Sequence, residues 1–100
     1  MKMYILVRDS VPRGLAVNSI GHASLACYLK FKHDLMMQQW LDESFKKVTC
    51  KVSDHQLDEA RLAGDFVEIT ENVLDNMIMC LAFKPREKYP EVFKTFKLYS

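Results

Sequence analysis

Charged and polar side chains follow the first apolar segment of this chain, at the point where a strand is expected to give way to a long helix. Arg8 and Asp9 come directly after the apolar residues 4–7, and His22 lies in the small-residue segment that follows. The first N–H groups of a helix lack intrahelical partners and favour anions, and open α/β sheets bind ligands at such junctions. The sequence therefore predicts a site around His22 that combines a base with anion-binding groups.

His22 is the candidate catalytic base, because imidazole is the side chain whose charge changes near neutral pH. A catalytic imidazole needs an orienting partner on its other ring nitrogen, and the location of Asp9 and Glu71 makes them the candidates. Thr70 is a candidate for substrate binding if it lies with Glu71 at the end of a strand, whereas a turn there would make both residues structural. The alternative for His22 is a structural ring that bonds to the backbone where helix and sheet meet.

Four more residues could bind a substrate near the start of this helix. Arg8 and Arg13 each carry a planar fork of five N–H donors, which suits a phosphate or a carboxylate. Asn18 and Ser19 follow at the expected helix start and could donate hydrogen bonds into the site. The alternatives are that the arginines are solvated at the surface or form a structural pair with Asp9, and that Asn18 and Ser19 cap the helix.

The composition indicates one globular domain over residues 1–100. Hydrophobic residues make up 49%, enough for a core, and the net charge of +1 does not by itself indicate nucleic-acid binding. Cys27, Cys50 and Cys80 lie in apolar segments without a C-x-x-C pair, which indicates buried thiols in a reducing cytoplasm. We expect no metal and no other cofactor. We also expect no membrane contact, since no apolar run approaches the roughly 18 residues of a spanning helix.

The spacing of apolar residues predicts an α/β fold. Strands are expected at residues 2–8, 46–52, 66–70 and 77–83, and helices at 15–32, 33–44, 53–64 and 89–97, with Ser53 capping the third helix and Gly64 ending it. Strands separated by helices favour parallel pairing, whereas two consecutive strands favour one antiparallel pair. We therefore predict a three-layer α/β/α domain with a mixed, mostly parallel four-stranded sheet.

Three segments in this order resemble type 2 peptidyl-tRNA hydrolases. Residues 6–9 (LVRD), 13–14 (RG) and 21–23 (GHA) are similar to the first strand, turn and helix of that family. Residues 46–54 resemble its second strand and the following helix start, and residues 96–99 resemble its closing residues. Residues 12–25 are also similar to an uncharacterised bacterial domain family of the same fold. The resemblance implies that fold over almost the whole chain.

The resemblance implies hydrolysis of the ester that joins a peptide to the 3′ ribose of tRNA, with tRNA as the partner. His22 stands at the family's histidine, and Arg13 stands at its first turn lysine. Other family positions differ: Leu15, Ser19 and Gly21 stand where the family has a second lysine, a glutamine and a serine, and residues 69–72 replace an Asp-Ala-Gly run.

Two functions remain open from the sequence. A hydrolase of this type would use His22 as base, Arg8 and Arg13 as anion contacts, and Asn18 or Ser19 to polarise the ester. A catalytically inactive member of the fold would instead bind RNA or another protein. A homodimer is a further expectation, with Trp40 and residues 35–37 as the exposed candidates for its interface.

Overall fold

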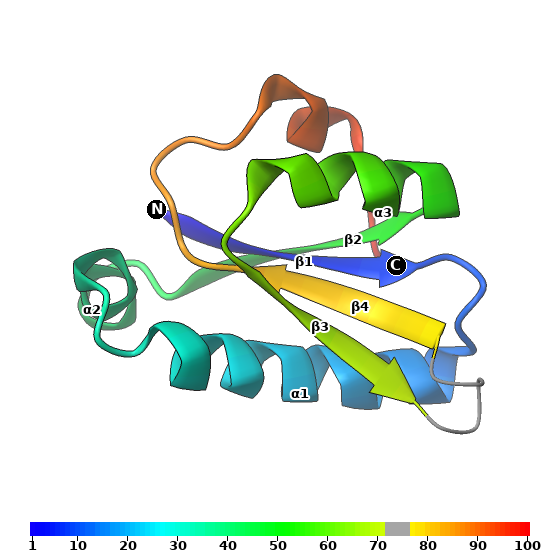
Figure 1. The fold of residues 1–100 in the computed structure, drawn as a ribbon, viewed down its shortest axis with the longest axis horizontal. Helices are drawn as coiled ribbons and strands as arrows, with labels where there is room; N and C mark the ends of the chain where they lie inside the picture. Colours follow the sequence, from blue (N-terminus) through cyan, green and yellow to red (C-terminus); the bar gives the residue numbers. More distant parts are fainter. Residues whose placement is uncertain (72–76) are drawn as a thin grey trace.

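The computed structural model describes residues 1–71 and 77–100, so Asn72 lies outside the described residues. Within them, one sheet carries helices on both faces (Figure 1). The strands are β1 (Lys2–Arg8), β2 (Lys46–Val52), β3 (Phe66–Glu71), β4 (Met77–Phe83) and β5 (Lys97–Leu98). The helices are α1 (Arg13–Phe31), α2 (Leu35–Asp42) and α3 (Asp54–Ala60), with 3₁₀ helices at Arg61–Ala63 and Glu91–Thr95.

The sheet has the strand order β3-β4-β1-β2-β5. This confirms the predicted α/β fold with a mixed sheet, although the sheet has five strands rather than four. The expectation of mostly parallel pairing was wrong, because only β1 and β2 pair in parallel and the other neighbours are antiparallel. The strands β1, β2 and β3 do run in one direction, as helical connections require, but β4 lies between β1 and β3 and runs against both.

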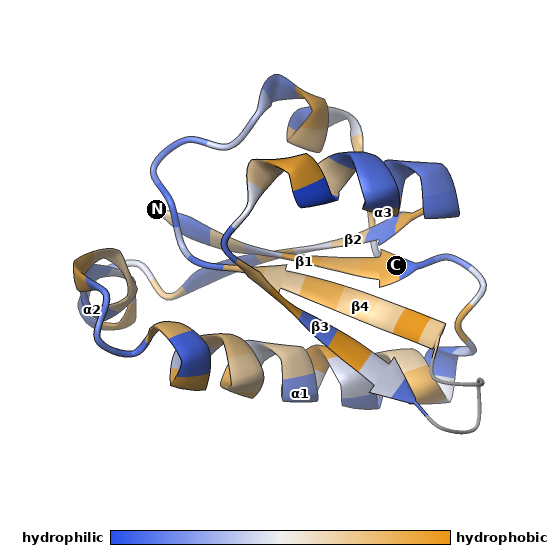
Figure 2. Ribbon diagram, viewed as in Figure 1, coloured by the Kyte–Doolittle hydropathy of each residue, from blue (hydrophilic) through white to orange (hydrophobic). Residues whose placement is uncertain are grey.

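Side chains from the two faces of β1 lie in two separate hydrophobic cores. Met3, Ile5 and Val7 pack under α1 and α2, whereas Tyr4 and Leu6 pack under α3 and the 3₁₀ helix Glu91–Thr95. Side chains alternate across a strand, so a strand that is apolar at every position must be covered on both faces. Figure 2 shows hydrophobic colouring along most of β1, the central strand, and along its neighbour β4.

A β-bulge interrupts β4 beside α1. Ile69 of β3 pairs with Cys80, but the next residue, Thr70, pairs with Ile78, so Met79 has no partner across the strand pair. The bulge places Met79 and Cys80 in the same core under α1, where strict alternation would have separated them. Bulges of this kind redirect a side chain, and here Met79 is turned toward the α1 side of the sheet.

Local signals in the sequence account for most helix boundaries. Ser53 accepts a hydrogen bond from the Gln56 N–H at 3.2 Å, and the Gln56 side chain accepts from the Ser53 N–H at 2.9 Å, a capping box that starts α3. Gly64 follows the 3₁₀ turn with a φ of 71°, a conformation that favours glycine. The helix expected at 89–97 is instead the 3₁₀ helix Glu91–Thr95, followed by β5, because residues 97 and 98 pair with β2.

Two of the four residues expected at a dimer interface are buried. Trp40 and Met37 of α2 are buried, and the Trp40 Nε1 donates to the Lys46 carbonyl at 2.8 Å. Leu35 and Met36 remain exposed. Trp40 and Met37 are therefore wrong as interface candidates, and the homodimer stays a prediction. In the part of the chain that is described, none of the helices has the length and apolar character needed to cross a membrane.

Candidate active site

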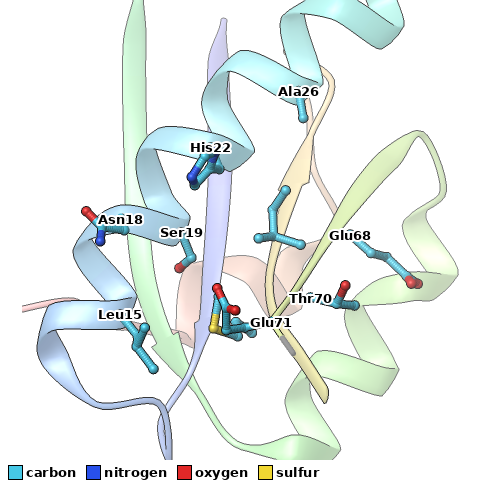
Figure 3. A pocket seen from close by; sticks show the side chains of 10 residues that line it. Leu15, Asn18, Ser19, His22, Ala26, Glu68, Thr70 and Glu71 are labelled. Atoms are coloured by element: carbon cyan, nitrogen blue, oxygen red, sulfur yellow. The ribbon is translucent and has the colours of Figure 1, made fainter. Parts of the chain in front are cut away.

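A cavity of about 440 Å³ lies between α1 and the edge strand β3 (Figure 3). Small-molecule sites commonly measure roughly 300–1,000 Å³, so the space can hold a substrate group. The predicted base and one of the two predicted carboxylates line it, together with three predicted polar residues. The lining consists of Leu15, Asn18, Ser19, His22 and Ala26 from α1, Glu68, Ile69, Thr70 and Glu71 from β3, and Met79 from β4.

The α1 wall follows from helical spacing. Asn18, His22 and Ala26 are four residues apart, so they lie above one another on one face of the helix. The adjacent face carries Ala23 and Cys27, which have no exposed surface against the sheet. Small buried residues let α1 approach β4 and β3 closely, and the polar residues Asn18 and His22 beside them line the cavity.

His22 lies on an exposed part of α1, not in a sealed apolar layer. Figure 3 shows its ring on the α1 wall and the Glu71 carboxylate on the facing wall. No hydrogen bond to the ring is found among the described residues, so the geometry gives no support to the structural alternative of a backbone-bonded imidazole. Of the two carboxylates considered as its partner, Glu71 lines the cavity and Asp9 does not.

Asn18 and Ser19 do not cap α1. Pro12 occupies the N-cap position without a side-chain hydrogen bond, and the helix starts at Arg13, so both residues lie inside it. The Ser19 hydroxyl is fully buried and donates to the Ala16 carbonyl at 2.9 Å. Asn18 is exposed at the rim of the same cavity. Its amide can therefore donate to a ligand, whereas the Ser19 proton is already used within the helix.

Thr70 and Glu71 end β3, as the strand interpretation required. The bulge opposite them leaves Met79 without a strand partner, and Met79 forms part of the cavity floor beside Ser19. A bulge bends its strand and increases the local twist. The last residues of β3 are thereby positioned around the cavity together with α1.

Arg8, Asp9 and Arg13 lie outside the cavity. An Arg8 Nη lies 3.3 Å from an Asp54 carboxylate oxygen at the start of α3, on the other face of the sheet. The Asp9 main-chain N–H donates to the Val52 carbonyl at 2.8 Å. Arg13 donates to the Ser100 carbonyl at 3.1 Å. The ion pair expected between an arginine and Asp9 is thus replaced by one with Asp54.

Cysteine chemistry is unsuited to this site. Cys80 lies beneath the cavity, and burial raises the pKa of its thiol to about 12, with the Ser19 hydroxyl opposing that shift. Burial likewise raises the pKa of Cys27 to about 12, which the nearby Lys30 charge opposes. A thiol with such a pKa carries almost no nucleophilic thiolate at neutral pH. Among the described residues, no cluster of three or more His, Cys, Asp or Glu side chains could hold a metal ion.

A comparison with protein-family models gives a match over almost the whole chain. The model of the family described as Peptidyl-tRNA hydrolase PTH2 matches residues 1–99 of the 100. The chain belongs to this family. The match confirms the resemblance drawn from the three sequence segments, and it spans both walls of the cavity. A search of curated proteins finds no match to the chain.

Some cavity residues of this PTH2 family member were not predicted. Ile69, Glu68, Ala26 and Met79 all line the cavity, yet none carries a distinctive motif. Ala26 could have been found from its four-residue spacing to His22. Met79 could not, because β4 is apolar throughout and its bulge has no sequence signal.

Proposed function

We propose that this PTH2 family member hydrolyses the ester between a peptide and the 3′ ribose of tRNA. The supporting observation is the cavity that combines His22 and Asn18 of α1 with Thr70 and Glu71 of β3. A base, a neutral donor and a carboxylate around one solvent-accessible space are the groups that water-dependent ester cleavage needs. Family membership supports the same chemistry and makes tRNA the expected partner.

In the proposed reaction His22 acts as general base. Its ring accepts a proton from water while the water oxygen bonds to the ester carbonyl carbon. The carbonyl oxygen then carries negative charge, which the Asn18 amide stabilises by donating a hydrogen bond. The bond from carbon to the ribose 3′ oxygen breaks, and that oxygen takes the proton back from the imidazolium. The products are a peptide with a free carboxyl group and tRNA with a free 3′ hydroxyl.

The other residues have supporting roles. During the reaction the Glu71 carboxylate turns toward His22 and accepts its second N–H, and the Thr70 hydroxyl contacts the substrate beside it. Asn18 rather than Ser19 polarises the ester, because the Ser19 hydroxyl donates to Ala16. Arg13 faces away from the cavity, with its guanidinium 5.9 Å from the centre of the Tyr99 ring. Lys51 lies over the same ring, so this pair is suited to RNA phosphates at a distance from the ester.

The decisive experiment identifies the bond that is cut. Purified protein is incubated with acetyl-alanyl-tRNA, and the products are separated under acidic conditions. We expect acetyl-alanine and intact tRNA that an aminoacyl-tRNA synthetase can charge again. Intact substrate after prolonged incubation with folded protein would reject the hydrolase function. Because this substrate arises during translation, the proposal also predicts a cytoplasmic location.

An inactive binding module is the second candidate, and two observations favour it. Leu15 presents an apolar side chain where the family carries a lysine, and Ser19 is buried where the family has a glutamine. This candidate predicts tRNA binding without hydrolysis. Binding through Arg13 and Lys51 should weaken steeply as salt concentration rises, because phosphate contacts release counterions. Salt-independent binding would argue against an RNA-binding role.

A further inference from the structure

The outer edge of β3 has main-chain groups that no other strand satisfies in the described part of the chain. β3 is the last strand of the sheet on its side. The Lys84 N–H donates to the Asp65 carbonyl at 2.8 Å, so the pair 65–84 is hydrogen-bonded across the two strands. Bonded and non-bonded pairs alternate in an antiparallel ladder. The N–H and C=O groups of Phe66 and Glu68 must therefore point outward, away from β4.

A contact at Phe66 confirms this direction. The Lys30 Nζ, which reaches across from α1, donates to the Phe66 carbonyl at 2.9 Å. The next outward position is Glu68, and Glu68 borders the cavity. Its carboxylate pairs with Arg61, and Figure 3 shows this side chain directed away from His22. Because the side chain is directed away, the main chain of Glu68 is the part that borders the cavity.

We propose that the peptide of the substrate binds as an added strand along this edge, with its main chain bonded to the N–H and C=O of Glu68. This inference rests on the proposed hydrolysis of peptidyl-tRNA. Edge addition is an established way for a sheet to bind an extended peptide, since main-chain bonds supply the affinity. The edge leads directly into the cavity with His22, so a peptide paired there delivers its C-terminal ester to the base.

The charges around this edge favour the peptide rather than the RNA. The Glu71 side chain lines the cavity, whereas the Glu68 carboxylate is paired with Arg61, and the outward carbonyl of Glu68 is a further acceptor. Lys30, the cation closest to this edge in the bonds described, is already bonded to Phe66. Phosphates would be repelled here, whereas a neutral peptide backbone offers both donors and acceptors.

The test compares substrates that differ only in their peptide. With the wild-type protein, kcat/KM for acetyl-tetraalanyl-tRNA should exceed that for acetyl-alanyl-tRNA by about 3- to 10-fold, the worth of one or two net hydrogen bonds. A peptide in which three sarcosines precede the final alanine has no N–H donors at those positions and should lose this advantage. Equal rates for all three substrates would overturn the proposal.

Glu68→Pro removes the outward N–H while leaving the bonds to β4, because proline is tolerated on edge strands with its nitrogen facing solvent. In this variant we expect kcat/KM for acetyl-tetraalanyl-tRNA to fall to about the value for acetyl-alanyl-tRNA, a ratio of about 1. Glu68→Ala is the matched control, since it loses the Arg61 ion pair but keeps the N–H, and its ratio should stay at the wild-type value. If the ratio of the two kcat/KM values fell to about 1 in both variants, main-chain pairing would be overturned.

A binding measurement separates this proposal from the hydrolase function. Acetyl-tetraalanine amide is titrated into the wild-type protein, and the amide resonances of β3 are followed by NMR. Edge pairing predicts concentration-dependent shifts of the Glu68 amide resonance and of its neighbours on β3. In Glu68→Pro, which has no amide at position 68, the shifts of the neighbouring β3 amides should be lost. If no peptidyl-tRNA is hydrolysed but the Glu68 resonance shifts, the hydrolase function fails and edge binding stands. An unshifted Glu68 resonance at millimolar peptide would reject edge binding in either case.

Discussion

Asn18 and Ser19 are neighbours in the sequence, but the structure assigns them different tasks. Asn18 is exposed at the cavity, and Ser19 is buried with its hydroxyl bonded to the Ala16 carbonyl at 2.9 Å. Loss of one donor that stabilises an oxyanion lowers kcat by roughly 10²–10³ in well-studied enzymes. We therefore predict a fall in kcat of about 100-fold for Asn18→Ala and less than about 2-fold for Ser19→Ala.

The stability of the two variants follows from their surroundings. Ser19→Ala removes one hydrogen bond, worth about 0.5–1.5 kcal/mol net. The Ala16 carbonyl keeps the helical N–H four residues later, and alanine gains up to about 0.5 kcal/mol in helix propensity. The free energy of unfolding should thus fall by about 0–1 kcal/mol. Asn18 is exposed, so Asn18→Ala should change it by about 0.5 kcal/mol or less.

Two assays on the same preparations test this assignment. Hydrolysis of acetyl-alanyl-tRNA gives kcat and KM, and urea unfolding gives the free energy of unfolding. A Ser19→Ala protein that loses activity as strongly as Asn18→Ala, at unchanged stability, would refute the reasoning. That result would mean that the Ser19 hydroxyl leaves Ala16 and reaches the substrate.

Two further predictions concern the scaffold. Ser53→Ala should lower the free energy of unfolding by about 1 kcal/mol in urea, because it removes the capping box that starts α3, and an unchanged urea midpoint would contradict it. Asp34 caps α2, and its hydrogen bond with Lys84 at 3.1 Å is the main cause that lowers its pKa, with burial opposing. A carboxyl with a lowered pKa in the folded state stabilises the protein above its unfolded pKa of about 4 and loses that contribution as the pH falls further. Asp34→Asn should therefore flatten the acid side of the stability profile measured between pH 6 and pH 2, and an unaltered slope would contradict the link.

Strong local patterns made most of the fold predictable. The continuous apolar character of β1 and β4 required cover on both faces, which the two cores provide. The insertion of β4 between β1 and β3 could not be predicted, because pairing order depends on long-range contacts and not on the order of elements. The two residues of β5 were also missed, since their pairing with β2 replaces the helix that their spacing suggested.

Strand alternation and helical spacing in the sequence already separate both arginines from the candidate site. Arg8 shares the strand face of Tyr4 and Leu6, so alternation places it on the α3 side, where Asp54 binds it. Arg13 and His22 are nine residues apart, about two and a half turns, so they point to opposite sides of α1. Both arginines could thus have been separated from His22 on geometry alone. The wall of the cavity opposite α1 could be predicted only as the region around Thr70 and Glu71. Its exact residues depend on the bulge at Met79, which no feature of the sequence indicates.

The hydrolase function depends on His22, and a single-turnover measurement tests this most directly. Acetyl-alanyl-tRNA is mixed with excess wild-type protein, His22→Ala or His55→Ala, where the control histidine is exposed on α3 outside the cavity. We predict hydrolysis by the wild type and by His55→Ala, and a loss of at least about 100-fold in His22→Ala at unchanged tRNA binding. Hydrolysis by His22→Ala at the wild-type rate would contradict the assignment of the base and of the cavity as the active site.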